Sequence, residues 1–342
     1  MELHERITAF VKLGVLIKEM LEQKNQALYE VMKKTEAHNP WFTIENQAYA
    51  LQQNAVLLHE NNLVKWTSLY PGLYEKKLPV TVAVIMAGNI PLVGFHDFVS
   101  VLMSGNIFLG KTSSKDRFLP EFIAGKLIEI EKGFADYIIF TEQVKKFDAV
   151  IATGSNNASR YFNYYFGRYP HIIRKNRNSL GILTGNESPG EMEALADDIF
   201  MYFGLGCRNV SKLYLPEDFK MNSIFEFFSK YSNTVHHNKY GNNYDYQKAI
   251  MQMNRQPFWD SGFMLLREAP MLSSPVAVVH FEYYKNRSLL ENELNSMKDQ
   301  IQCIVSSQDI FKGAVPFGKT QQPELWDYAD GIDTMKFLLD LA

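Results

Sequence analysis

From residue 80 onward, the sequence alternates short β-branched runs with segments of helical periodicity. The first four runs are VTVAVIM at 80–86, NIFLGK at 106–111, YIIF at 137–140 and DAVIAT at 148–153. Strands that alternate with helices of about 10–15 residues predict parallel βαβ units, whose binding loops lie at the carboxyl ends of the strands. We therefore expect the loops at 87–91, 111–116 and 153–159 to share one edge of a sheet.

A second alternation of the same kind follows Arg174, with β runs at 179–185, 210–215, 275–281 and 301–305. The chain has 342 residues, which exceeds the roughly 100–200 residues of one typical domain. We therefore predict two α/β domains, formed by residues 1–180 and 181–310. Residues 311–342 are expected to form a C-terminal segment that packs back on the fold.

Apolar side chains recur at helical spacing over residues 6–33, which predicts an N-terminal helix that packs on the fold or contacts a second copy of the chain. A second helix is expected to reach about Leu58. Residues 78–96 contain no Asp, Glu, Lys or Arg and have the length of about 18 residues that a membrane span requires. Pro79, Gly88 and further breakers interrupt this stretch, so we expect a strand and a helix there and no membrane span.

The composition excludes several classes of function. A net charge of −3, from 35 basic and 38 acidic residues, gives no overall field that would attract nucleic acid. Two cysteines, Cys207 and Cys303, cannot form a disulfide framework, and the charged opening MELHERITAF is unlike a signal peptide. We expect a soluble protein of the reducing cytoplasm that binds no nucleic acid, and the cysteine spacing predicts no metal site.

Gly154 and Ser155 lie where the strand at 148–153 is expected to meet a helix. Backbone N–H groups at a helix start, beside a residue without a side chain, form an anion site suited to a pyrophosphate. The segment does not match GxGxxG, however. A role of Ser155 as a plain helix N-cap explains the pattern at least as well.

Further polar residues follow strands on the same expected edge. Lys111 ends the NIFLGK run and begins the loop KTSSKD, which contains Ser113 and Ser114. Its ammonium can bind ribose hydroxyls or phosphate, or remain a solvated surface group. Asn89 follows the first strand in AGNIPL, where its carboxamide either donates to a developing oxyanion or belongs to a simple turn. The basic run at 174–177 offers phosphate contacts or a hydrated face.

Cys207 stands behind two glycines in FGLGCRNVSKLYLP. A thiol near a helix start and near Arg208 can have the lowered pKa that attack on a thioester or aldehyde requires. Its backbone N–H, together with Asn89, can hold the resulting oxyanion. A buried, inert cysteine is the alternative for Cys207, and it is our interpretation of Cys303 within the apolar IQCIV run.

The order of these segments resembles the aldehyde dehydrogenase superfamily and, within it, the acyl-CoA reductase family that includes the fatty-acid reductase subunit of bacterial bioluminescence. The resemblance covers roughly residue 78 to the C-terminus. AGNIPL is similar to the oxyanion turn of the superfamily, GNIFLGKTSS to its cofactor-lysine strand, and Thr153-Gly154-Ser155 to the turn under the nicotinamide cofactor. GLGCRNVSKLYL resembles the nucleophile segment, and VPFGKTQQPELWDYADG the stretch that closes the fold.

This resemblance implies an aldehyde dehydrogenase-like fold with a Rossmann-like cofactor domain, residues 1–180, and a catalytic cysteine domain, residues 181–310. It implies an active site in the cleft between the two domains. The residues that it assigns to catalysis are Cys207 and Asn89, and those that it assigns to cofactor binding are Gly154, Ser155, Lys111, Ser113 and Ser114.

Three departures from the superfamily pattern refine this expectation. Ser179-Leu180-Gly181 stands where dehydrogenases carry "ELGG", so the glutamate that activates water is missing. Ser114 replaces a glutamate that holds the adenosine ribose, which removes repulsion against a 2′-phosphate and favours NADPH over NADH. Residues 271–275, MLSSP, replace the "EIFGP" stretch that grips the nicotinamide ribose.

The resemblance therefore implies NADPH-dependent reduction of an acyl-CoA to an aldehyde through an acyl-cysteine, because an acyl-enzyme without a water-activating base survives to accept hydride. NADH is the second choice of cofactor. The alternatives are a reductase of another activated acid, such as an acyl phosphate, and a non-catalytic binding relative of the same fold. The sequence leaves the acyl chain length and the formation of a homo-oligomer open.

Overall fold

The computed structural model describes residues 1–75, 77–307 and 311–341. The chain divides into two compact units. The first unit runs from Met1 to Asn176 and includes the C-terminal residues from Glu324, and the second unit runs from Arg177 to Pro323. The domain limits at residues 180 and 310 remain a prediction, and residue 310 lies outside the described residues.

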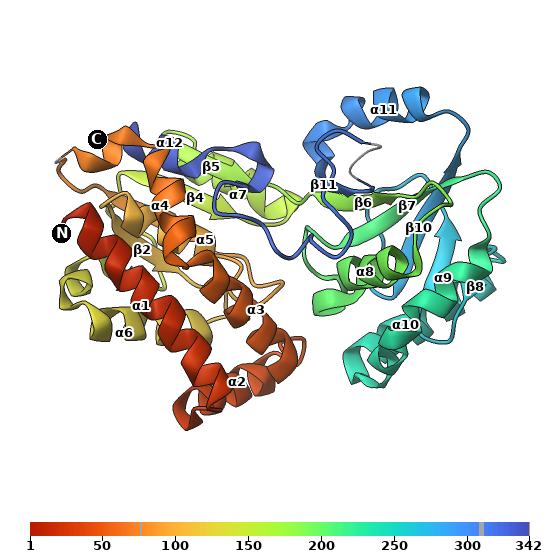
Figure 1. Cartoon of the computed structure of the whole chain (residues 1–342), viewed down its shortest axis with the longest axis horizontal. Helices are drawn as coiled ribbons and strands as arrows, with labels where there is room; N and C mark the ends of the chain where they lie inside the picture. Colours follow the sequence, from red (N-terminus) through yellow and green to blue (C-terminus); the bar gives the residue numbers. More distant parts are fainter. Residues whose placement is uncertain (76, 308–310, 342) are drawn as a thin grey trace. The chain divides into compact units, whose positions relative to one another are not determined.

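The first unit opens with four helices and continues as alternating strands and helices (Figure 1). Its elements are α1 (Leu3–Glu22), α2 (Gln26–His38), α3 (Ile44–Leu57), α4 (Glu60–Ser68), β1 (Thr81–Ile85), α5 (Phe95–Met103), β2 (Ile107–Lys111), α6 (Phe118–Ile130), β3 (Ile138–Phe140), β4 (Ala149–Thr153), α7 (Asn156–Phe166), β5 (His171–Arg174) and α12 (Thr334–Leu339). Short 3₁₀ turns lie at Pro71–Tyr74, Lys132–Asp136 and Ala329–Gly331.

Residues 6–33 form two helices, whereas the sequence analysis expected one. Lys24 adopts a left-handed φ of 49° between them, a conformation that ends a right-handed helix. Asn25 then caps α2, because its side chain accepts a hydrogen bond from Leu28 N–H at 3.2 Å.

The five strands of the first unit form one parallel sheet in the order β3-β2-β1-β4-β5. Successive crossovers run to one side of β1 and then to the other, so the strand order reverses between β1 and β4. Open α/β sheets bind ligands outside the carboxyl ends of the strands at such a reversal. The predicted βαβ organisation is confirmed.

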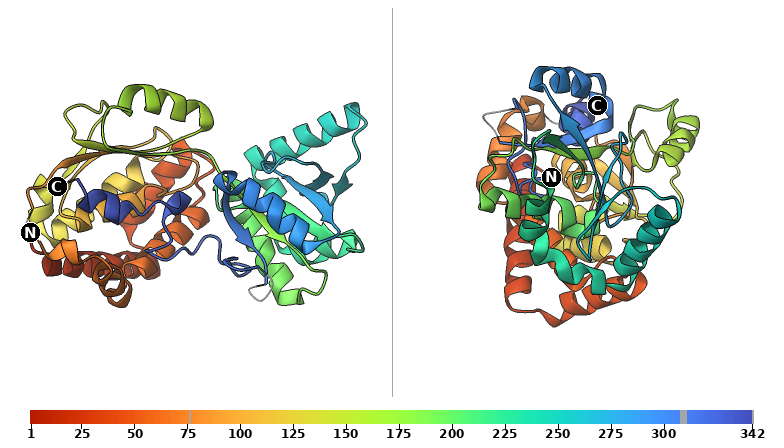
Figure 2. Two further views of the ribbon diagram at one scale, coloured as in Figure 1. Left: turned by 90° about the horizontal axis from the view of Figure 1, so that it is seen from above. Right: turned by 90° about the vertical axis from the view of Figure 1, so that its right-hand side faces the viewer.

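Helices cover both faces of this sheet. Val82, Val84 and Phe108 face a core that α1, α5 and α6 share, while Ala83 and Val150 face the aromatic side of α7. Figure 2 shows α7 on the opposite face of the sheet from α1. Because both faces are buried, the strands are continuous apolar runs rather than alternating ones.

The second unit contains a separate six-stranded sheet in the order β11-β6-β7-β10-β9-β8, parallel except for β8. Its elements are β6 (Asn178–Ile182), α8 (Pro189–Phe200), β7 (Val210–Pro216), α9 (Met221–Phe228), α10 (Asn238–Met253), β8 (Trp259–Asp260), β9 (Leu265–Glu268), β10 (Val278–Tyr284), α11 (Arg287–Ser296) and β11 (Ile301–Val305), with 3₁₀ turns at Met201–Gly204, Ser229–His236 and Lys298–Gln300. Leu213 and Leu215 of β7 pack toward α8 and α9, and Tyr214 packs toward α11.

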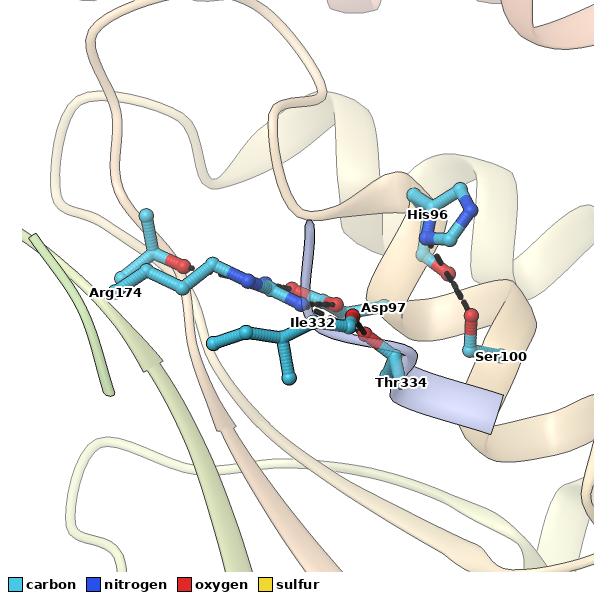
Figure 3. Close-up of polar contacts among 7 residues, drawn as sticks. His96, Asp97, Ser100, Arg174, Ile332 and Thr334 are labelled. Carbon is cyan, nitrogen blue, oxygen red and sulfur yellow. Dashed lines mark hydrogen bonds and ion pairs between the residues drawn. The ribbon is translucent and has the colours of Figure 1, made fainter. Parts of the chain in front are cut away.

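A buried ion pair ties the C-terminal helix α12 to the first sheet (Figure 3). Arg174 donates to both carboxylate oxygens of Asp97, at 2.6 and 2.9 Å, and to Thr334 Oγ1 at 2.9 Å. The side chains of Arg174 and Asp97 are only 6% and 7% exposed. Phosphate binding by Arg174, one interpretation of the basic run at 174–177, is therefore wrong, because this guanidinium is already committed inside the unit.

The stretch at 78–96 forms β1, a loop and the start of α5. No helix within the described ranges combines the length and the apolar character that crossing a membrane requires.

Candidate functional site

The predicted cofactor residues of the first unit lie at one edge of its sheet. Lys111 ends β2 opposite Ile85, the last residue of β1, and is exposed. Strand β4 ends at Thr153 beside the same strand β1. The loops after β1, β2 and β4 thus share the carboxyl edge at the reversal of strand order, as the sequence predicted.

Ser155 caps α7, so the simpler of its two predicted roles is present. Its hydroxyl accepts a hydrogen bond from Ala158 N–H at 3.2 Å. The first two N–H groups of the helix, those of Asn156 and Asn157, have no acceptor among the residues that the structure describes. N–H groups of this kind carry the positive end of the helix dipole and suit a phosphate.

Gly154 gives close access to this helix start. A Cβ placed on Gly154 would lie 2.9 Å from Ala158 Cβ and 2.9 Å from the Phe162 ring. Such distances are well below ordinary van der Waals contact, so a side chain would displace the first turn of α7. Its N–H donates to the Arg174 carbonyl at 3.3 Å, so the anion-binding capacity of this turn rests on the N–H groups that follow it.

The loops that carry Asn89 and the two serines interlock. A Cβ on Gly88 would lie 2.3 Å from Ser113 Oγ, so only glycine allows the first loop to cross the second. Asn89 is exposed next to this crossing. Ser114 is also exposed, and its carbonyl oxygen lies 2.7 Å from His38 Nε2. A change in one loop therefore reaches the other by direct contact.

Asp116 makes the second link between these loops. Its Oδ2 accepts from Leu92 N–H at 2.7 Å, and Leu92 has a left-handed φ of 57°. A leucine in that region costs on the order of 1 kcal/mol or more, so the hydrogen bond holds a strained turn. Oδ1 of Asp116 is buried and has no hydrogen-bond partner in the described part of the chain.

Burial raises the pKa of Asp116 to about 7, against the opposing effect of the Leu92 hydrogen bond. The raised pKa means that folding favours the protonated acid. The resulting contribution to stability is complete below the unfolded value of 3.8 and is lost as the pH rises through about 7.

We expect Asp116→Asn to flatten the loss of stability between pH 5 and pH 8. The wild type should lose about 2 kcal/mol more of its free energy of unfolding over this interval than the variant. Urea titrations at both pH values measure the difference. Asp136→Asn, which neutralises an exposed carboxylate of the same unit, is the matched control. Parallel curves for wild type and Asp116→Asn would contradict the assignment.

Cys207 lies in the second unit, in a loop between α8 and β7. Three consecutive residues before this loop have left-handed backbones, with φ values of 54° at Tyr202, 58° at Phe203 and 75° at Gly204. For the two aromatic residues this conformation is strained, by on the order of 1–3 kcal/mol each. Strain of this size persists only where the surrounding structure over-determines it, and it is concentrated at functional sites.

Hydrogen bonds from the Asn209 side chain help to hold this strained segment in place. Its side chain is buried and donates to the carbonyl oxygens of Asp198 at 3.0 Å and Met201 at 2.9 Å, at the end of α8. Its Oδ1 accepts from Gly206 N–H at 2.8 Å. Gly206 and Asn209, on either side of Cys207, are thus both anchored by hydrogen bonds. Cys207 itself is half-buried.

Ser179 fixes the loop from the sheet side. Its hydroxyl donates to the Cys207 carbonyl oxygen at 2.9 Å and lies 3.0 Å from Cys303 Sγ. Ser179 is fully buried. It stands where the ELGG motif of dehydrogenases has its glutamate. A hydroxyl bonded in this way offers no base for activating water.

Cys303 has the properties of an inert thiol. Burial raises its pKa to about 11, although Arg208 and the Ser179 hydrogen bond act in the opposite direction. Nucleophilic sulfur is the thiolate, so the raised pKa disfavours reaction at Cys303, although this residue is half-buried like Cys207.

The segment that resembles the closing stretch of the superfamily packs on α8. Asp198 Oδ2 accepts from Gly318 N–H at 2.7 Å, and Oδ1 accepts from Thr320 N–H at 3.0 Å. Burial raises the pKa of Asp198 to about 6. Asp198 therefore joins two segments. Its carbonyl oxygen accepts from Asn209 in the Cys207 loop, and its carboxylate accepts from the closing segment.

The loop at 271–275 is anchored at its base. Lys212, fully buried in β7, donates to the Pro270 carbonyl at 2.9 Å and pairs with Glu282. Ser211 Oγ donates to the Leu272 carbonyl at 2.7 Å. The MLSSP loop is thus held by hydrogen bonds, but it lacks the glutamate of the "EIFGP" stretch.

The amino-acid sequence matches the family model described as acyl-CoA reductase (LuxC) over residues 17–240. The chain belongs to the acyl-CoA reductase family. A comparison with curated proteins gives no significant match.

Solved structures of aldehyde dehydrogenases share the fold. Aldehyde dehydrogenase 21 from Physcomitrella patens, in complex with its reaction product succinate, is 12% identical with a TM-score of 0.70, over 100% of this chain and 84% of that one. An aldehyde dehydrogenase from Bacillus cereus, in complex with NAD⁺, is 13% identical with a TM-score of 0.61, over 90% and 71%. The expected aldehyde dehydrogenase-like α/β fold is confirmed, and family and fold together make this acyl-CoA reductase relative an oxidoreductase.

The cofactor candidates and Asn89 lie in the first unit and Cys207 lies in the second, and their roles stay predictions. Asp116 and Asn209 are not among the predicted site residues. Both act through backbone groups brought near by the fold, and neither belongs to a motif. The one available signal for Asn209 was its position two residues after Cys207.

Proposed function

We propose that this protein reduces an acyl-CoA thioester to an aldehyde with NADPH, through an acyl intermediate on Cys207. The observation that carries the proposal is the match to the acyl-CoA reductase family together with the half-buried Cys207 on a strained, anchored loop. Site residues in such loops are positioned by their scaffold rather than by their own flexibility.

In the proposed reaction, the Cys207 thiolate attacks the thioester carbonyl, and the new oxyanion accepts hydrogen bonds from Cys207 N–H and the Asn89 carboxamide. The carbonyl re-forms as the carbon–sulfur bond to coenzyme A breaks, which leaves an acyl-cysteine. A bound NADPH would supply hydride to this carbonyl. Collapse of the resulting thiohemiacetal returns the electron pair to sulfur and releases the aldehyde.

The carboxyl edge of the first sheet supports the cofactor assignment. The N–H groups of Asn156 and Asn157 offer a phosphate site, Gly154 keeps the approach to them open, and Lys111 is exposed at the same edge of the sheet, two strands away. Ser113 and Ser114 would lie along the ribose of the nucleotide. The buried hydroxyl of Ser179 replaces a water-activating carboxylate, which favours hydride transfer over hydrolysis of the acyl-enzyme.

We expect Ser114→Glu to reverse the preference for NADPH. A carboxylate at this exposed position repels a 2′-phosphate and can accept a hydrogen bond from a 2′-hydroxyl, so KM for NADPH should rise about tenfold with little change for NADH. Initial rates with both cofactors measure the shift. Ser68→Glu, which adds the same charge to exposed Ser68 in α4, is the control. Equal changes for both cofactors would refute a ribose contact at Ser114.

The decisive test is a panel of acyl-CoA thioesters of increasing length, assayed with NADPH for release of free CoA thiol and formation of aldehyde. Phosphate release from an acyl phosphate would identify the other activated acid as substrate instead. A non-catalytic relative would form no acyl adduct on Cys207 when exposed to an acyl-CoA without cofactor, as mass spectrometry of the peptide would show.

A further inference from the structure

Arg6 is a buried cation without an ion-pair partner. It lies in α1 with 7% of its surface exposed, and its Nε has no hydrogen-bond partner within the described ranges. Within the described ranges its guanidinium makes no hydrogen bond and no ion pair, and Tyr137, Glu2 and Glu5 act on it only by longer-range electrostatic attraction. Burying a charge without a directly bonded partner is costly. An arginine in this state is therefore available to pair with an anion from outside the chain.

The nearest structural group satisfies the guanidinium only in part. Gly105, just past the end of α5, has a φ of 83°, and a Cβ there would lie 2.2 Å from Arg6 Nη1. The last turn of α5 thus offers the negative end of a helix dipole. Two of its carbonyl groups are already used, however, since Gly105 N–H bonds to Leu102 O at 3.1 Å and Asn106 N–H to Val101 O at 3.2 Å.

Arg6 lines a cavity of about 420 Å³ in the first unit. This volume lies within the range of about 300–1,000 Å³ that is usual for small-molecule sites. His4, Tyr137 and Asn106 also contribute to the wall. The Asn106 side chain already has hydrogen-bond partners, because its Oδ1 accepts from Val80 N–H at 3.2 Å and its Nδ2 donates to Ser104 Oγ at 2.9 Å. The His4 imidazole and the Tyr137 hydroxyl make no hydrogen bond among the described residues, and Tyr137 interacts electrostatically with Arg6. Both groups add potential donors to the wall of the cavity.

The cavity lies at the opposite edge of the sheet from the proposed cofactor residues. The cavity is lined by Pro79, Asn106 and Tyr137, which lie within two residues of the amino ends of β1, β2 and β3. Lys111, in contrast, is the last residue of β2, and Gly154 follows the carboxyl end of β4. A ligand in this cavity therefore occupies a different site from a nucleotide at the carboxyl edge.

We propose that this cavity is a second binding site, which takes a small anion through a phosphate or carboxylate group paired with Arg6. The planar fork of a guanidinium matches both groups and binds either of them with two parallel hydrogen bonds. Glu2, Glu75 and Lys77 also line the cavity and are exposed. Because this exposed part of the wall carries both signs of charge, it suits a small molecule with one anionic group better than a large polyanion.

Thermal unfolding of the full chain tests this site with inorganic phosphate in one arm and malonate in the other, at constant ionic strength. At a concentration ten times Kd, the anion that binds should raise Tm by about 3 °C in a saturable manner. Arg6→Met, which keeps an unbranched side chain and removes the charge and its hydrogen-bond donors, should lose this rise. A response to phosphate alone or malonate alone distinguishes the two sources of the anionic group.

Two controls separate this site from general charge effects and from the cofactor edge. Lys18→Met removes an exposed charge from the same helix and should keep the rise in Tm. Lys111→Met removes a charge from the proposed cofactor edge, so it should keep the part of the rise that Arg6→Met loses. If Arg6→Met does not fold, Arg6→Lys keeps the charge without the fork and should weaken binding about tenfold. The proposal is overturned if neither anion shifts the wild type, or if the shift is unchanged in the Arg6 variant.

Discussion

Replacing Cys207 with alanine should abolish aldehyde formation. In the proposed reaction this sulfur forms and breaks the bond to the acyl group, so no other side chain replaces it, and kcat should fall by at least about 10⁴-fold. The measurement is consumption of NADPH in the presence of an acyl-CoA, combined with mass spectrometry of the Cys207 peptide after a cofactor-free incubation. The wild type should carry one acyl adduct and the variant none.

Cys303→Ala is the matched control, because it removes the other sulfur of the same unit. Cys303 lies 3.0 Å from the Ser179 hydroxyl that also binds the Cys207 loop, so its loss is expected to change kcat by less than about fivefold through small shifts of that loop. An acyl adduct on Cys303, or full activity in Cys207→Ala, would overturn the proposed roles of the two cysteines.

The sequence predicts the framework of both sheets because parallel strands buried on two faces leave a continuous apolar signal. β1 and β4 lie within the predicted runs for this reason. The elements between residues 237 and 270 are harder to predict. Helix α10 is rich in Asn, Tyr and Lys and has no clear apolar stripe, and β8 contains only two residues. Local pattern carries little information about such elements.

The candidate site divides in the same way. Residues at the ends of strands, such as Lys111 and Gly154, follow from the alternation of strands and helices together with the family resemblance. The contacts that hold the site do not, because they join a side chain to a backbone group distant in sequence. Asp116 binds the N–H of Leu92, and Ser179 binds the carbonyl of Cys207. A backbone N–H or carbonyl has the same chemistry at every position, so nothing in the sequence marks which one will be chosen.

Breaking the ion pair between Arg174 and Asp97 should destabilise the first unit more than any surface change. Both side chains are almost fully buried, so Asp97→Leu or Arg174→Met leaves an unpaired charge in the core, and the free energy of unfolding should fall by about 3–5 kcal/mol. Urea denaturation measures the loss. Glu22→Gln, which breaks the exposed pair with Lys18 at 3.8 Å, should cost less than about 1 kcal/mol.

The double variant Asp97→Leu with Arg174→Met distinguishes the loss of attraction from the cost of an abandoned charge. An apolar pair leaves no buried charge, so it should recover part of the stability that either single variant loses. Thr334 complicates a full recovery, because its hydroxyl accepts from Arg174 at 2.9 Å and helps to hold α12. If the double variant is as unstable as the sum of the two single variants, the ion pair acts by attraction and by anchoring α12 rather than by mutual neutralisation of two buried charges.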